Sequence, residues 1–268
     1  MPQNKRHFLL ALTVTMTTMT SNALAGAWAL PRGEAEVIFK QTYAKDISPT
    51  PFHEARYNQR EIYGQLGLGR NAMVTFTTLT KRSAQLGPYP TGSKQEIEIV
   101  YAPKRASLSL FPPGLTQVIS KIRGKPVERY KSASIGIGYS QLKLNGRPTD
   151  QEFLRSSISV GDKIAFGSIG LFGHVTWADL SNNRDHITDA RATLALESSR
   201  YGIGYEFAYF DQENREPVLE DLVFFEIALP WRRAKLRVTR AKKTIALTRF
   251  NSRHLGIWLR IPFDTSLK

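Results

Sequence analysis

The feature that most constrains the fold of this chain is an alternation of apolar residues with small or polar ones, at a period of two. From Tyr201 to Tyr209 the odd positions are Tyr, Ile or Phe and the even positions are Gly, Glu or Ala. The same pattern runs from His254 to Phe263 and recurs over most of the sequence after residue 25. Because successive side chains of a β-strand point to opposite faces, the alternation predicts an all-β chain with one apolar face per strand.

Two architectures fit such strands, a water-soluble β-sandwich and a membrane-spanning β-barrel. The alternating segments run about ten residues, which is the length that crosses a bilayer at a tilt and exceeds the usual soluble strand. We therefore predict a single antiparallel transmembrane β-barrel of about twelve strands, within a range of about 10 to 14. The predicted strands are 34–44, 60–69, 73–82, 95–111, 131–143, 152–160, 164–180, 188–198, 201–211, 219–231, 234–242 and 253–263.

The connections between these strands predict two unlike ends of the barrel. Short turns are expected on the periplasmic side at 70–71, 161–163 and 232–233, and longer loops on the outside, as in bacterial outer-membrane barrels. The segment 111–130, which contains Pro112-Pro113 and a basic run, fits no strand, so a loop, a short helix and a plug all remain open. Aromatic residues near strand ends predict interfacial girdles at Tyr43, Tyr139, Trp177, Tyr201, Tyr209, Trp231 and Phe263.

The N-terminus has the organisation of a secretory signal peptide. Lys5 and Arg6 precede an apolar run from Phe8 to Met16, and Ala23-Leu24-Ala25 provides small residues at a cleavage site. We expect residues 1–25 to be removed and residues 26–268 to form the barrel domain. The chain has no cysteine, which excludes disulfides and a lipid-modified N-terminal Cys, and no motif for a cofactor or metal is found.

The charge balance is basic throughout the barrel domain. The sequence carries 37 Lys and Arg against 23 Asp and Glu, and 35 against 23 without Lys5 and Arg6. An exported protein is separated from nucleic acid, so we expect no nucleic-acid partner. The excess is predicted in turns and loops, at 121–125, 232–233 and 240–243, where it would meet the phosphates of lipopolysaccharide. Lys and Arg that merely extend to the interface and keep the protein soluble are an equally good explanation.

Two stretches carry a resemblance to a known group of proteins. Residues 26–34, GAWALPRGE, resemble the mature N-terminus of proteobacterial outer-membrane barrels of the porin-like exported type, which open A-W-x-x-P-[KR]-G-E. Residues 61–71, EIYGQLGLGRN, resemble their second strand and its tight turn. The resemblance implies outer-membrane location, insertion by the barrel-assembly machinery and a barrel fold, without defining an activity. Such barrels usually finish on an aromatic residue, whereas here five residues follow Phe263.

The predicted lumen contains nearly balanced charges. On the polar faces of the strands we expect these candidate constriction residues: Glu36, Lys40, Glu96, Glu98, Arg191, Glu206, Glu226, Lys235, Arg237 and Arg260. Twelve strands enclose more space than the eight whose interior side chains just fill. The pattern favours a narrow passive channel for small polar solutes, with weak anion preference if any. A non-conducting structural or surface-interaction barrel is the alternative.

A lipid-acting enzyme of the outer membrane is a third function class. Its candidates are a Ser/His arrangement near Ser181, Asp185 and His186, or His174 in the lumen. No G-x-S-x-G, H-E-x-x-H or P-loop motif occurs, and His174 beside Thr176 is more typical of a hydrogen-bonded structural histidine. We therefore predict no catalytic site.

Overall fold

The computed structural model describes residues 30–47, 54–83, 92–103, 107–144, 150–212, 217–229, 234–245 and 248–264. Within these ranges the chain forms twelve strands and one helix. They are β1 (Glu34–Ile47), β2 (Glu54–Gly69), β3 (Ala72–Ser83), β4 (Gly92–Tyr101), α2 (Leu115–Arg123), β5 (Glu128–Leu144), β6 (Gln151–Phe166), β7 (Ile169–Ser181), β8 (His186–Ser198), β9 (Tyr201–Gln212), β10 (Val218–Ala228), β11 (Ala234–Ile245) and β12 (Thr248–Asp264). The predicted signal peptide, residues 1–25, lies outside the described residues.

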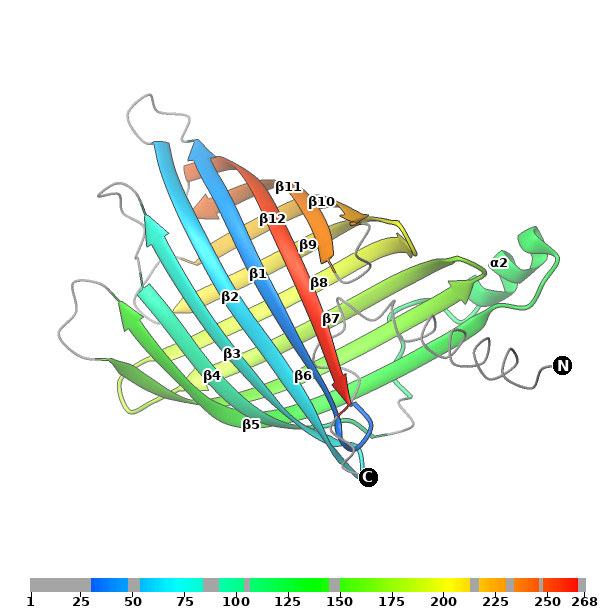
Figure 1. Ribbon diagram of the computed structural model, residues 1–268, viewed down its shortest axis with the longest axis horizontal. Coiled ribbons are helices and arrows are strands. Elements are labelled where there is room, and N and C mark those ends of the chain that lie inside the picture. The colour runs from blue at the N-terminus through cyan, green and yellow to red at the C-terminus, as the bar shows by residue number, and fades with distance from the viewer. Residues whose placement is uncertain are drawn as a thin grey trace, which may run out of the picture.

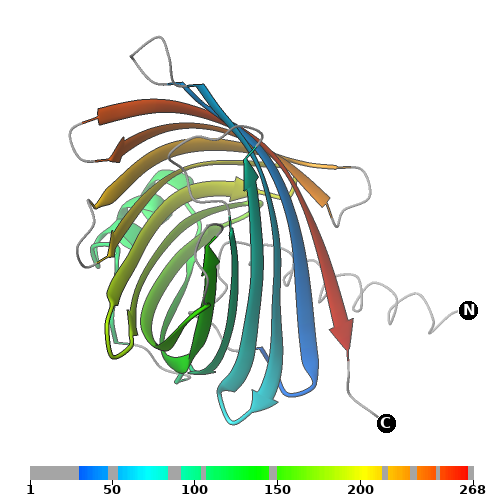
Figure 2. The same cartoon turned by 90° about the vertical axis from the view of Figure 1, so that its left-hand side faces the viewer.

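The strands form one closed antiparallel barrel. Each strand pairs with the next along the chain, and β12 pairs with β1 from Glu34↔Asp264 to Ile47↔Asn251, which closes the sheet. Figure 1 shows the strands running obliquely across the molecule, and Figure 2 shows the sheet curving round to enclose an interior. Closure leaves no unpaired sheet edge, which satisfies the backbone hydrogen bonds that a hydrocarbon environment cannot. The predicted all-β barrel and its twelve strands are confirmed.

The two ends of the barrel differ. At one end, here called the turn end, β1 begins, β12 ends, and Arg70-Asn71 joins β2 to β3. Both turn residues have positive φ, 52° and 66°, as a tight type I′ hairpin turn requires, and this predicted turn is confirmed. The other end, the loop end, carries the connections between β1 and β2, β3 and β4, and so on around the barrel.

Several predicted strand boundaries are wrong, among them the ends of β6 and β4. The turn expected at 161–163 is part of β6, and the chain reverses at Gly167, whose φ is 71°. Gly161-Asp162-Lys163 reads as a turn, but Asp162 is completely buried on the outer face of β6 by contacts with a distant segment. The strand expected at 95–111 ends at Tyr101. The apolar residues after it belong to a connection that packs on the barrel and does not continue the strand.

The connection between β4 and β5 lies at the turn end but is long, and it contains α2. Of the three alternatives for 111–130, the short helix is correct, with Gly124 (φ 64°) ending it in the left-handed conformation. Its contacts are with the outer face of the wall, so it is not a plug. Figure 1 shows α2 beside the ends of β5, β6 and β7. In the described part of the chain, no helix is long and apolar enough to cross a membrane.

The outer face of the barrel is apolar, the reverse of a water-soluble protein. Exposed outward side chains include Ile135 and Ile137 of β5, Ile203 of β9, and Val223 and Phe225 of β10. Their sequence neighbours point inward and are largely shielded, as the alternating burial along the strands shows. Apolar rows of this extent need hydrocarbon as solvent. The chain is therefore a transmembrane barrel, and a β-sandwich is excluded because its apolar faces would pack together in the interior.

The interior is not uniformly polar, which departs from the predicted lumen. One buried apolar cluster joins four strands and consists of Phe172, Ala195, Leu222, Phe224 and Ala241. A second lies toward the loop end of β6 to β8 and consists of Phe153, Ala178, Leu180 and Ile187, with Leu142 packed against it. From the sequence alone, a phenylalanine or leucine that points into the lumen cannot be told apart from one that points toward lipid. These clusters narrow the space that is left for water.

Candidate functional site

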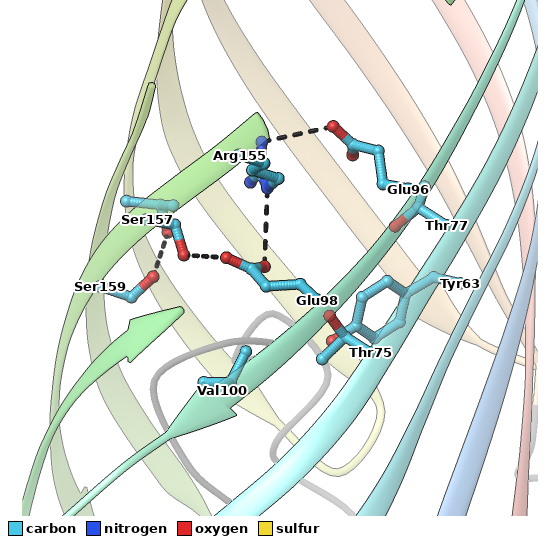
Figure 3. A pocket seen from close by; sticks show the side chains of 10 residues that line it. Tyr63, Thr75, Thr77, Glu96, Glu98, Val100, Arg155, Ser157 and Ser159 are labelled. Atoms are coloured by element: carbon cyan, nitrogen blue, oxygen red, sulfur yellow. Dashed lines mark hydrogen bonds and ion pairs between the residues drawn. The ribbon is translucent and has the colours of Figure 1, made fainter. Parts of the chain in front are cut away.

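Four inward charges on β4 and β6 form one connected group, named here the β4–β6 cluster: Lys94, Glu96, Glu98 and Arg155. The Arg155 guanidinium lies 3.3 Å from Glu96 Oε1 and 3.6 Å from Glu98 Oε2. Lys94 Nζ lies 2.7 Å from Glu96 Oε1. Figure 3 shows Arg155 reaching from β6 toward the two glutamates of β4, across the strand that separates them. The cluster thus ties together strands that do not pair directly.

The strand between them, β5, is built to allow this contact. Its inward residues are only Ser or Gly from Ser132 to Ser140. A Cβ on Gly136 would lie 2.2 Å from Glu98 Oε1, and a Cβ on Gly138 would lie 2.1 Å from the Ile97 carbonyl oxygen. Any larger residue there would displace Glu98. The short inward side chains of β5 therefore leave room for the charged side chains of β4 and β6 to meet above this strand.

A polar cavity of about 90 Å³ adjoins this cluster. Its lining is made of hydroxyl and charged groups with Val100 as the one aliphatic member: Tyr63, Thr75, Thr77, Glu96, Glu98, Val100, Arg155, Ser157, Ser159 and Thr176. Figure 3 shows these side chains converging from several strands. Ser157 donates to Glu98, and Ser159 and Thr176 share a hydrogen bond of 3.0 Å. A cavity of this size and polarity holds water readily.

A second group, the β9–β11 cluster, consists of Glu206, Glu226, Lys235 and Arg237. Arg237 Nε donates to Glu226 Oε1 at 2.9 Å, and Lys235 Nζ donates to Glu226 Oε2 at 3.1 Å. Arg237 Nη1 lies 3.5 Å from Glu206 Oε2. The guanidinium also stacks on Phe224, with its carbon 3.7 Å from the ring centroid. This cluster therefore borders the apolar cluster around Phe224, where water is excluded.

The remaining predicted charges whose side chains are described lie on β1 and β8. Lys40 Nζ pairs with Glu61 Oε1 at 2.8 Å, and Gln65 Nε2 donates to Glu36 Oε2 at 2.9 Å. Arg191 makes a two-pronged contact with Asp189, at 3.0 and 3.2 Å. The Arg191 side chain is 58% exposed on the inward face of β8, the most open of the basic groups in these clusters and pairs.

The structure thus brings the predicted lumen charges together in separate groups around the interior. Glu96 joins Glu98, and Glu206 joins Glu226, Lys235 and Arg237, whereas Glu36, Lys40 and Arg191 make the contacts with Gln65, Glu61 and Asp189 given above. The side chain of Arg260 lies outside the described residues. Among the described residues, the charged partners that sequence reasoning missed include Glu61, Lys94, Arg155 and Asp189. Glu61 and Asp189 share the parity of Gln65 and Arg191 on their strands, so alternation alone could have identified them.

The predicted girdle residues fall on the outer face where their side chains are described. Tyr43, Tyr139, Trp177 and Tyr201 are exposed, and Tyr209 is half-buried with its hydroxyl donating to Asp211 at 2.9 Å. Trp231 and the side chain of Phe263 lie outside the described residues. The role of these residues as an interfacial girdle stays a prediction.

The two histidines weighed for catalysis occupy different surroundings. His174 is buried on the inward face of β7, with Nε2 3.3 Å from Thr176 Oγ1. His186 Nε2 lies 2.5 Å from Asp179 Oδ1 at the exposed loop end. Ser181 is the register partner of His186, yet no side-chain hydrogen bond joins them among the described residues. No group of His, Asp and Glu arranged to hold a metal is found among the described residues.

Comparison with solved structures finds the same architecture at low sequence identity. A crystal structure of an outer membrane channel from Pseudomonas putida F1 matches with a TM-score of 0.53 at 8% identity, over 89% of this chain and 98% of that chain. The KdgM porin matches with a TM-score of 0.46 at 10% identity, over 82% of this chain and 98% of the porin. No family model and no curated sequence matches the chain. The likeness concerns the fold, and the family predicted from residues 26–34 and 61–71 stays a prediction.

Proposed function

We propose that the chain spans the outer membrane of a Gram-negative bacterium and forms a narrow, porin-like passive channel for small polar solutes. The observation that carries the proposal is the polar cavity beside the β4–β6 cluster, enclosed by a barrel whose outer face is apolar. Solved barrels of this architecture include an outer membrane channel and a porin. In this orientation the turn end faces the periplasm and the loop end faces outward, as in bacterial barrels.

The proposed channel discriminates weakly by charge. Within each cluster the acidic and basic groups compensate each other at contact distance, so little net field remains along the lumen. Arg191 is the exception, because more than half of its side chain is open to the interior. We expect a weak preference for anions that depends on this arginine.

Planar-bilayer recording with the purified, refolded chain tests the channel. We expect discrete, ohmic conductance steps that are smaller than those of wide porins and carry small ions. Enlarging the lumen by Arg155→Ser should increase the step size, because the bridge from β6 to β4 is removed. A membrane that stays silent although the barrel is folded and inserted, as judged by a heat-modifiable gel shift, would reject the channel and leave the membrane barrel standing.

A second candidate, a non-conducting structural barrel, is favoured by one observation. Phe172, Leu222 and Phe224 pack together inside the lumen, and a further apolar cluster lies toward the loop end. If these clusters close the path, Phe224→Ala should open conductance in a chain that is otherwise silent. A folded Phe224→Ala barrel that stays silent would show that this cluster does not close the path, and the packing around Phe224 would no longer favour this candidate.

Lipopolysaccharide is the proposed lipid partner on the outer side. Past the exposed apolar residues Val238 and Leu255, the next outward residues toward the loop end are Arg240 and Arg253, which are directly opposite in the pairing of β11 and β12. Directly opposed like charges destabilise a sheet unless an anion lies between them. In the structure the basic run 240–243, which was predicted for a loop, belongs to β11.

The double variant Arg240→Gln and Arg253→Gln tests this partner. We expect phosphorylated lipid A to raise the melting temperature of the parent barrel and to have a smaller effect on the variant. Lys143→Gln is the matched control, since Lys143 is exposed near the loop end but pairs with Asp150 at 3.6 Å. Equal stabilisation of all three proteins would contradict a phosphate site at this edge.

Export and assembly complete the proposal. The signal peptide would be cleaved before Gly26, and insertion would use the barrel-assembly machinery. Mass spectrometry of the protein isolated from outer membranes tests the cleavage site. Deleting residues 265–268, so that the chain ends close to Phe263, tests whether those residues affect the rate of assembly.

A further inference from the structure

The connection between β4 and β5 exposes apolar side chains in both its extended and its helical parts. Leu108 and Leu110 are exposed before the helix. In α2, Val118 is 53% exposed and Ile122 is 79% exposed, and no residue of this fully described helix is buried. A connection that faced only water would gain nothing from such residues.

These residues form an ordered pattern. Leu115, Val118, Ile119 and Ile122 follow a spacing of three and four, which places them on one stripe of the helix. Leu115 and Ile119 are half-buried, whereas Val118 and Ile122 are open. Lys121 and Arg123 occupy the last turn, followed by Lys125. An apolar stripe beside basic residues is typical of a helix that lies in a membrane interface.

A buried carboxylate fixes the connection against the outer wall. Asp162 points outward from β6 and accepts hydrogen bonds from the backbone N–H groups of Leu110 and Phe111, both at 3.0 Å. Ser109 Oγ donates to it at 3.1 Å, and Arg129 pairs with it at 2.6 Å. The opposite residue on β7 is Gly173, and a Cβ there would lie 3.0 Å from the Phe111 ring. The wall is therefore shaped to receive this segment.

The contacts that Asp162 makes with residues 109–111 and Arg129 lie within the apolar outer surface. On β6 the outward neighbours of Asp162 are Val160 and Ile164, and on β7 those of Gly173 are Leu171 and Val175. At the far end of α2, Arg123 lies over the ring of Phe166, 5.9 Å from its centroid. Residues 109–111 thus lie on the surface that hydrocarbon covers, and the C-terminal end of α2 reaches the same face where β6 ends.

We propose that residues 107–111 and α2 form a lateral anchor in the phospholipid leaflet at the turn end, an inference that rests on the membrane orientation proposed above. Val118, Ile122 and Leu108 enter the boundary of the acyl chains. Lys121 and Lys125 bind the phosphates of anionic phospholipids. Phospholipid is preferred to a protein partner because the segment leading into the helix lies on the lipid-facing surface and the charges at the end of the helix, Lys121, Arg123 and Lys125, are all basic.

Single-cysteine spin labels provide the test, since the chain has no cysteine of its own. Ile122→Cys reports the open side of the stripe, Gln117→Cys the polar face of the same helix, and Ile137→Cys the lipid-facing wall. In vesicles containing phosphatidylglycerol, we expect the label at 122 to collide more with oxygen than with a water-soluble nickel reagent, as the label at 137 does. The label at 117 should show the reverse. Val118→Cys is the second reporter of the stripe.

The outcomes separate the two proposals. A label at 122 as accessible to nickel as that at 117, with 137 still protected, would overturn the anchor and leave the barrel orientation intact. Loss of protection at 137 as well would instead refute the membrane orientation itself. The label at 122 should lie less deep in vesicles of phosphatidylcholine alone, and an equal depth in both lipids would overturn the role of Lys121 and Lys125.

Discussion

The β4–β6 and β9–β11 clusters use the same local device and lie in opposite surroundings. In the first, Gly136 and Gly138 let Glu98 and Arg155 meet over β5, and a polar cavity lies beside them. In the second, Gly204 makes room for the ring of Phe224, since a Cβ there would lie 2.3 Å from it. Phe224 and its apolar partners then exclude water from one side of Arg237.

The difference shows that glycine on the inward face of one strand only leaves space in the lumen. The side chains of the flanking strands then determine whether charged groups and water or apolar groups occupy that space. Beside β5 the neighbours carry glutamate, serine and arginine, so charge and water occupy the lumen. Beside β9 the inward residues of β10 include Leu222 and Phe224, so the wall is packed like a protein core. We therefore expect the β9–β11 region to hold the barrel together and the β4–β6 region to control passage.

The largest effect is expected from Phe224→Ala. Removing a fully buried aromatic ring from the packed region should lower the free energy of unfolding by about 3–5 kcal/mol, through lost burial and a residual cavity. Urea titration of the barrel in lipid vesicles measures this change. Phe225→Ala is the matched control, because the next residue faces lipid and should cost less. Equal losses for the two variants would show that the interior near β10 is not packed.

Arg237→Gln should follow, with a loss of about 3 kcal/mol, because Glu226 would remain buried with Lys235 as its main partner. The same titration measures it. Adding Glu226→Gln to the variant should recover part of the stability, since the uncompensated carboxylate is then removed. If the double variant is less stable than Arg237→Gln alone, burial of the charge is not the cause.

Much of the fold could be predicted from the sequence, because alternation reports which face of a strand meets hydrocarbon. It could not locate the end of β6, since Gly161-Asp162-Lys163 has the composition of a turn. Asp162 is retained inside a strand only because Arg129 and the segment at 109–111 satisfy it. Those partners are distant in sequence, and local patterns carry no information about them.

The site was predictable in part for a similar reason. Parity placed Glu96, Glu98 and Arg237 on the inward face, but parity does not tell which side chains meet. Arg155 was missed because its strand, with Leu154, Ser156 and Ser157 around it, shows no clean alternation. Its contact with Glu96 and Glu98 depends on the size of residues on β5, an effect that only the assembled sheet reveals.

Arg155→Gln should have a mixed effect that distinguishes the two regions. The stability loss should be about 1.5 kcal/mol, less than for Arg237→Gln, because Lys94 and cavity water can still solvate the glutamates. Removing one positive charge should also shift ion permeability toward cations by about two-fold, as an interaction of about 0.5 kcal/mol at about 8 Å in water implies. Reversal potentials in a salt gradient measure the shift, and an unchanged value would show that ions do not pass this cluster.

Arg191→Gln should give the smallest change in stability, below about 0.5 kcal/mol, because a side chain that is 58% exposed pairs with Asp189 in a watery setting. Its effect on permeation should nevertheless be similar to that of Arg155→Gln, since the charge faces the open interior. The informative quantity is therefore the ratio of the two effects, measured by urea titration and by reversal potential on the same preparation. A stability loss as large as that of Arg237→Gln would place Arg191 in the packed part of the barrel. A reversal potential equal to that of the parent would instead remove it from the path of the ions, and the separation between a region that holds the barrel and a region that filters would fail at this residue.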